Sequence, residues 1–172
     1  PDWKIGDQWT YAVRQPGREP LTTRTIVRED TFHGETTYII KTTEHEVVHS
    51  KKTLARLAIL NAGQLTSKRT GSSRDFSWPL TLGKEWRNSR SWEDRVTQTA
   101  HNIDSSMLVS EIGNITVPAG TFLAARVQEY DWSSGRLRRE YWYSPETKWI
   151  VKLRDYSDVA FRIEELTSFK IK

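Results

Sequence analysis

The C-terminal half of the chain alternates short β-prone segments with turn-forming residues. Each segment is rich in β-branched or aromatic residues, and Gly, Asn, Ser or Pro separates it from the next. Connections this short cannot hold crossover helices, so we expect the segments to pair as an antiparallel meander. The predicted strands cover residues 91–99, 107–112, 115–117, 121–132, 136–144, 149–156 and 159–169, with turns between them at Asn102 and at Gly113-Asn114.

The clearest corner in this pattern is Pro118-Ala119-Gly120. Pro118 has no N–H to give to a sheet ladder, and Gly120 tolerates a positive φ. We therefore predict that one strand ends at Val117 and that the next begins at Thr121.

The N-terminal half is predicted to hold strands at residues 5–13, 22–29 and 36–43, with a hairpin turn at His33-Gly34. Residues 44–62 fit two structures. Thr43-Glu44-His45-Glu46 has the form of a capping box, which favours a helix, whereas strands at 44–48 and 54–60 fit equally well.

One short pattern occurs twice: an aliphatic residue, Gly, two polar residues and Trp. The two copies are Ile5-Gly6-Asp7-Gln8-Trp9 and Leu82-Gly83-Lys84-Glu85-Trp86. The repetition suggests two similar strand starts.

In the predicted strand at 136–144, Trp142 points opposite to Tyr141 and Tyr143, so both faces of the sheet are expected to be partly covered. The predicted fold is mainly β, a single curved antiparallel sheet or open barrel with at most one or two short helices.

Composition narrows the class of protein. A chain of 172 residues predicts one β domain over 1–172, and no apolar run approaches the ~20 residues of a membrane-spanning helix. The net charge of +4 comes from interspersed basic and acidic residues, so we expect no nucleic-acid partner. The absence of cysteine suits either a reducing compartment or an exported protein without disulfides. The chain opens on Pro1, as a mature form trimmed of a targeting segment would, so export is one expectation.

Three stretches resemble a group of exported bacterial proteins. They are Gly-Lys-Glu-Trp at 83–86, residues 115–122 and Tyr141-Trp142-Tyr143-Ser144-Pro145. They look like the DUF3108 and TapB-like proteins, whose function is unknown. The resemblance implies a curved antiparallel sheet similar to the LolA and LolB lipoprotein carriers, and a periplasmic or outer-membrane-associated location. It supplies no catalytic residues.

The motif with the most specific chemistry is His45-Glu46-Val47-Val48-His49. On a helix, such a motif presents two His to zinc and a Glu as general base. On a strand the two His would lie about 13 Å apart, too far to bind one ion. No Glu occurs between Glu46 and Glu85 to act as a nearby third ligand. We therefore expect no zinc site, and keep a small zinc metalloprotease as the alternative function.

A second candidate site is Arg136, Arg138 and Arg139 near Trp142, which could follow a phosphate backbone while the ring stacks on a base. Alternation places Arg138 and Arg139 on opposite faces, and acidic residues lie close in sequence. A charge-paired, solvated strand is the simpler interpretation.

No catalytic residue, metal site or cofactor is expected, and the sequence does not identify the binding residues. The predicted function is that of a non-enzymatic cell-envelope protein that binds a lipid-like ligand or an envelope protein. The concave face of a curved sheet, lined by aromatic residues, would provide the binding surface.

Overall fold

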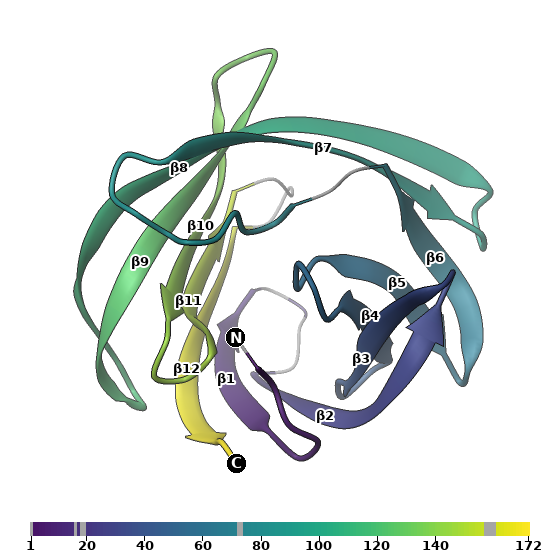
Figure 1. Cartoon of the computed structure of the whole chain (residues 1–172), viewed down its shortest axis with the longest axis horizontal. Helices are drawn as coiled ribbons and strands as arrows, with labels where there is room; N and C mark the ends of the chain where they lie inside the picture. The colour runs from purple at the N-terminus through teal and green to yellow at the C-terminus, as the bar shows by residue number, and fades with distance from the viewer. Residues whose placement is uncertain (1, 16, 18–19, 72–73, 157–160) are drawn as a thin grey trace.

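The computed structural model describes residues 2–15, 17, 20–71, 74–156 and 161–172. Twelve β-strands occupy most of this length, and no helix is found in it (Figure 1). No membrane-spanning helix is therefore found among the described residues. The strands are β1 (Gln8–Arg14), β2 (Leu21–Phe32), β3 (Glu35–Lys41), β4 (Glu46–Ser50), β5 (Arg56–Asn61), β6 (Gln64–Thr70), β7 (Glu85–Asp94), β8 (Thr99–Val117), β9 (Gly120–Asp131), β10 (Leu137–Ser144), β11 (Trp149–Asp155) and β12 (Arg162–Lys170).

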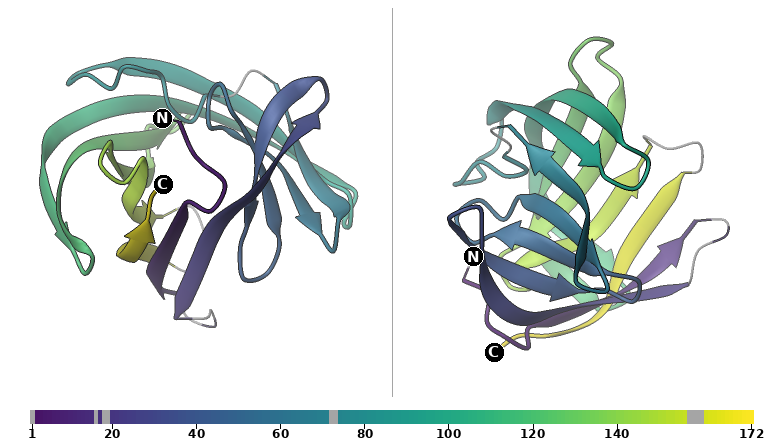
Figure 2. Two further views of the ribbon diagram at one scale, coloured as in Figure 1. Left: turned by 60° about the horizontal axis from the view of Figure 1, so that its bottom comes forward. Right: turned by 90° about the vertical axis from the view of Figure 1, so that its right-hand side faces the viewer.

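The strands form a closed antiparallel barrel. Each strand pairs with its neighbours in the chain, and β1 also pairs with β12 (Figure 2, right). The mainly β prediction is confirmed. The barrel is closed where an open sheet or open barrel was expected, because β1 and β12 pair from Gln8↔Lys170 to Arg14↔Ile163. This pairing satisfies the backbone groups that two free edges would expose.

Residues 44–62 form strands, so the helix alternative for this segment is wrong. Val47 lies opposite Ile59, and Val48 lies opposite Ala58. Val47 faces the barrel interior, whereas Val48 packs with Ile39 and Ala58 in a separate apolar cluster. Adjacent residues with different surroundings are what a strand requires, since its side chains alternate between two faces.

The predicted corner at Pro118 is confirmed. β8 ends at Val117, β9 begins at Gly120, and these two residues pair across the turn. Gly120 has a φ of 139°, which a residue with a Cβ rarely adopts. The predicted strands that follow match β9, β10 and β11, and β12 matches from residue 162; positions 159–160 of the predicted strand lie outside the described residues.

The predicted breaks within β8 are wrong, because the strand runs without interruption through Asn102 and Gly113-Asn114. A register shift between Val109 and Glu111 bends it while pairing with β9 continues.

The predicted strand at 91–99 instead contains a hairpin turn. The carboxylate of Asp94 accepts hydrogen bonds from the backbone N–H groups of Val96 and Thr97, at 2.8 and 2.9 Å. An aspartate that binds the backbone two residues ahead in this way stabilises a turn.

Large side chains fill one part of the barrel interior, here called the aromatic core. Its ring-bearing members are Trp3, Trp9, Tyr11, Tyr38, Phe76, Phe122, Tyr143 and Trp149. Residues 74–84, which lead into β7, lie across the ring in the view of Figure 1 and contribute Phe76. The Phe76 ring lies 5.6 Å from that of Tyr143 and 6.1 Å from that of Trp149.

The two similar strand starts are confirmed in detail. In both, the Gly has a positive φ and its N–H donates to a carbonyl on the next strand, from Gly6 to Ile26 at 2.8 Å and from Gly83 to Val109 at 2.9 Å. In the opposite direction, the N–H of Ile26 donates to the carbonyl of Asp7, and the N–H of Val109 donates to the carbonyl of Lys84. One copy begins β1 and the other leads into β7.

Candidate functional site

A cavity of about 500 Å³ lies inside the barrel beside the aromatic core. Phe76, Trp149 and Ile150 belong both to the core and to the cavity wall, so the cavity begins where the packed side chains end. Its volume falls within the range of ~300–1,000 Å³ that is usual for small-molecule sites.

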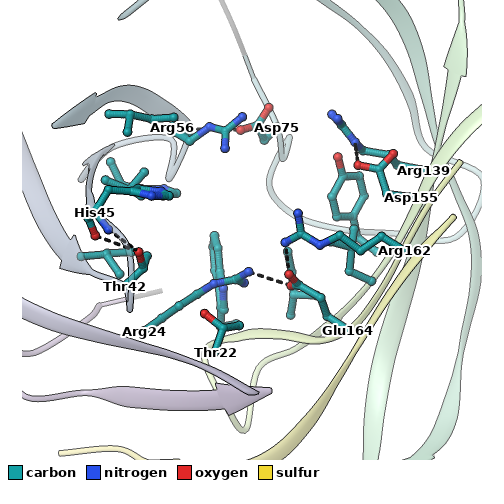
Figure 3. Close-up of a pocket in the computed structure, with 18 of the residues that line it drawn as sticks. Thr22, Arg24, Thr42, His45, Arg56, Asp75, Arg139, Asp155, Arg162 and Glu164 are labelled. Atoms are coloured by element: carbon teal, nitrogen blue, oxygen red, sulfur yellow. Dashed lines mark hydrogen bonds and ion pairs between the residues drawn. The ribbon is translucent and has the colours of Figure 1, made fainter. Parts of the chain in front are cut away.

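Charged side chains dominate the rest of the wall. Because alternate residues of a strand face the lumen, arginines from six different strands reach one space. Figure 3 shows several of them converging. We call this space the arginine cavity; its charged lining residues are Arg24, Arg56, Arg69, Arg90, Arg139, Arg162, Glu44, Asp75, Asp155 and Glu164.

Arg69 and Asp75 form a two-pronged ion pair in the wall. The two terminal nitrogens of Arg69 lie 3.1 and 2.8 Å from the two carboxylate oxygens of Asp75. Desolvation inside the barrel would raise the pKa of Asp75, but the positive charges of Arg69 and its neighbours outweigh it and lower that pKa. Asp75 is therefore ionised and holds Arg69 in position.

Arg90 and Arg139 share a buried carboxylate behind the wall. Arg90 donates to Glu129 at 2.6 Å, and Arg139 lies 3.7 Å from the other oxygen of Glu129. Arg139 also donates to Asp155 at 2.7 Å. Burial would raise the pKa of Glu129, but the two arginines reverse the direction and lower it.

Glu164 bridges two further arginines (Figure 3). Arg24 donates to one of its oxygens at 2.7 Å and Arg162 donates to the other. The pKa of Glu164 is lowered, because these two charges exceed the effect of burial. One negative charge thus serves two positive ones.

Arg56 differs from the other five arginines. In the part of the chain that the structure describes, no ion pair joins its guanidinium to a carboxylate; instead its charged group lies over the Trp92 ring, 4.7 Å from the ring centre. Desolvation and the nearby charges of Arg139 and Arg69 lower the pKa of Arg56 to about 10, although Asp75 acts in the opposite direction. The site therefore holds a cation in surroundings that disfavour its charge.

The predicted zinc motif lies on β4 and the residues before it, not on a helix. His49 is buried, and its Nδ1 lies 2.7 Å from the carbonyl of Leu54, which can only accept; Nδ1 therefore carries the proton. Burial lowers the pKa of His49 to about 4, so its ring is neutral. Among the described residues, no group of three or more His, Cys, Asp or Glu could hold a metal ion. The helical spacing that the metalloprotease alternative requires is not formed.

The predicted arginine strand divides as alternation requires. Arg138 pairs with Asp131 at 3.2 Å, whereas Arg139 enters the arginine cavity, so only part of the set is solvated. Trp142 lies on the other face of β10 from Tyr141, within 5.3–5.9 Å of the charged groups of Arg126, Lys152 and Arg154. Arg139 and Trp142 therefore do not share the surface that the nucleic-acid interpretation requires.

The arginine cavity itself is not among the sequence predictions. A signal for it is present in strands where an arginine and a large apolar residue stand two positions apart, as in Arg24/Ile26, Arg90/Trp92 and Arg139/Tyr141. Residues two apart share a face, so an arginine in register with a buried residue faces the interior.

Comparisons with known proteins find relatives in structure only. No family model matches the chain, and no curated protein matches it. A protein from Parabacteroides distasonis, provisionally described as a lipoprotein, has a TM-score of 0.50 at 14% identity and covers 97% of this chain and 96% of its own. A Bacteroides fragilis protein, provisionally described as exported and with a YmcC-like fold, has a TM-score of 0.52 at 12% identity and covers 98% of this chain and 97% of its own. The hypothetical lipoprotein YmcC of Escherichia coli has a TM-score of 0.55 at 12% identity and covers 94% of this chain and 84% of its own.

At these identities the likeness shows a shared fold. The barrel resembles the folds of these three proteins, one of which is described as YmcC-like, and all three are provisionally described as lipoproteins or as exported. The expected likeness to the DUF3108 and LolA groups stays a prediction.

Proposed function

We propose that this protein is a non-enzymatic envelope protein that binds a small lipid-like ligand inside its barrel. The observation that carries the proposal is the cavity of about 500 Å³, bounded by both apolar and charged side chains. Such mixed walls suit amphiphilic molecules, because each end of the ligand meets a surface of its own kind.

Apolar residues line one side of the cavity as a continuous strip. Ile40 lies opposite Val47 across β3 and β4, and Val47 lies opposite Ile59 across β4 and β5. This strip, Ile40–Val47–Ile59, offers a surface for a hydrocarbon chain. The charged wall faces the same space, which gives the cavity an amphiphilic character (Figure 3).

Two further observations support the proposal. The ion pairs fix most of the guanidinium groups before any ligand arrives, and preorganised groups bind with a smaller loss of conformational entropy. The proteins with similar structures are described as lipoproteins or as exported, which supports a place in the periplasm or at the outer membrane.

Native mass spectrometry of protein purified without detergent tests the proposal. We expect an adduct with the mass of an amphiphile, lost when the cavity is filled by Ile59→Trp and retained in Leu123→Trp, where the substituted side chain is 58% exposed. Bare wild-type protein that also fails to take up added dodecanoate and dodecanol would contradict the proposal and leave a surface-interaction role.

A further inference from the structure

Among the residues that the structure describes, Arg56 has no carboxylate partner of its own, although it lies in a wall where the other arginines form ion pairs. Arg69, Arg90 and Arg139 contact Asp75, Glu129 and Asp155, and Arg24 and Arg162 share Glu164. Among the described residues, the guanidinium of Arg56 contacts the Trp92 ring, and the backbone N–H of Arg56 donates to Asp75 at 3.4 Å. Its guanidinium therefore keeps its hydrogen-bonding capacity toward the cavity.

The described residues around the cavity carry excess positive charge. Six arginines line the cavity, while the carboxylates that contact them among the described residues are Asp75, Glu129, Asp155 and Glu164. Glu44, the other acidic residue in the wall, lies in the connection between β3 and β4 with a side chain that is 55% exposed. Two positive charges are left without an interior counter-charge in the described part of the barrel.

The hydrogen-bonding groups show the same imbalance. Among described residues of the cavity wall, the buried polar atoms that lack a protein partner are all N–H donors: Arg69 Nε, Arg90 Nη1, Trp149 Nε1 and Arg162 Nε. No buried acceptor of this wall is unpaired in the same part of the chain. Since unpaired donors call for an acceptor, the wall suits oxygen-rich, negatively charged groups.

Arg56 also stands at the end of the apolar strip. Along β4 and β5, Val47 pairs with Ile59, and His49 pairs with Arg56. His49 is neutral and its Nδ1–H donates a hydrogen bond to the carbonyl of Leu54, so it adds no charge beside Arg56. One wall thus places a cation at the end of a hydrocarbon surface.

We propose that Arg56 binds the anionic headgroup of the ligand, a carboxylate or phosphate oxyanion, while the ligand's chain lies along Ile40–Val47–Ile59. The inference rests on the proposed function and names the ligand class. A bound oxyanion supplies the counter-charge that Arg56 lacks and accepts hydrogen bonds from the guanidinium, which is suited to two-pronged contacts with such groups. The lowered pKa of Arg56 agrees, since a cation without a partner is disfavoured there.

Isothermal titration with four probes of equal chain length tests the headgroup. The probes are dodecanoate, dodecyl phosphate, dodecyltrimethylammonium and dodecanol, each used below its micelle concentration. We expect wild-type protein to bind the better of the two anions at least tenfold more tightly than dodecanol and to bind the cationic probe weakest. Which anion binds more tightly identifies the oxyanion. Equal binding of anionic and neutral probes would overturn the inference while the proposed function stands, and binding of no probe would remove both.

The matched variants are Arg56→Gln, Arg56→Lys and, as a control, Arg87→Gln on the outside of β7, where Arg87 pairs with Asp104. Arg56→Gln should weaken binding of the preferred anion at least tenfold and leave dodecanol within twofold. Arg56→Lys should retain part of the preference, and Arg87→Gln all of it. Thermal melting separates binding from folding: both Arg56 variants should melt at or above the wild-type temperature. An Arg56→Gln protein that is folded and binds all probes as wild type does would refute the assignment.

Discussion

The aromatic core and the arginine cavity occupy the same barrel and are built from many of the same strands, yet they bury polar atoms differently. In the core, the N–H groups of Trp3 and Trp9 donate to the carbonyls of Lys148 and Thr147 at 2.9 and 2.8 Å, and the Tyr11 hydroxyl donates to Ile150 at 2.8 Å. In the cavity, four buried donors of the described wall lack protein partners. Three of these four donors belong to arginines, and the fourth belongs to Trp149, where the core and the cavity meet.

This difference separates stability from recognition. Closely packed aromatic side chains stabilise the folded state through dispersion and through burial of apolar surface. Arginines held by buried carboxylates add little net stability, because removing both charges from water offsets most of their attraction. Substitutions in the two regions should therefore change stability by different amounts and for different reasons.

The largest loss of stability should come from the core. Trp9→Ala removes a side chain that is 0% exposed, together with its hydrogen bond to Thr147, and should lower the free energy of unfolding by about 3–5 kcal/mol. Chemical denaturation measures this. Trp132→Ala, at a position 54% exposed, is the control and should change stability by less than about 1 kcal/mol. Equal losses would mean that Trp9 is not part of a packed core.

A smaller loss should follow when one charge of the buried pair is removed. Arg90→Met leaves Glu129 without its nearest cation and should lower the free energy of unfolding by about 3 kcal/mol. The double variant Arg90→Met/Glu129→Gln removes both charges and should recover most of that loss. Denaturation curves of the wild type, the single variant and the double variant measure this recovery. A double variant as unstable as the single one would show that the pair stabilises by more than charge balance.

The smallest effect concerns His49, which lies between the two regions. The unfolded chain protonates this residue below about pH 6.5, but the folded protein does so only below about pH 4. The unfolded state therefore binds more protons in this window, and stability is lost as the pH falls through it. Between pH 7.5 and pH 5 the loss should be about 2 kcal/mol.

Urea denaturation at several pH values measures the slope that His49 contributes. In His49→Asn this part of the slope should vanish. A His49→Asn protein with an unchanged slope would assign the pH dependence to other groups.

The same physical cause limits what the sequence predicts about fold and site. Strands whose alternation sets apolar against polar residues, such as β9, β10 and β11, are predicted almost to the residue. β6 is not predicted, and β7 only in its last part, because their inward positions include Arg69, Asn88 and Arg90. Polar residues on the inner face remove the hydrophobic signal on which strand prediction depends.

The strands that are hardest to predict thus carry part of the candidate site. Barrel closure is equally invisible in the chain, since the pairing of β1 with β12 joins residues more than 140 positions apart, such as Gln8 and Lys170. The two short motifs differ in outcome. Both copies of the repeated Gly-containing pattern lead into a strand, as predicted, whereas His45-Glu46-Val47-Val48-His49 does not form a helix.

The two matching strand starts divide the ring into two arcs of equal size, β1–β6 and β7–β12. The arcs meet at two seams, where β1 pairs with β12 and β6 pairs with β7. An arc alone would leave the outer edge of each of its two end strands unpaired, and pairing with the other arc covers both edges. The two arcs therefore relate to each other as two different half-barrels that associate within one chain. The chain segment that joins β6 to β7 keeps the two arcs together and so raises the effective concentration of each arc for the other.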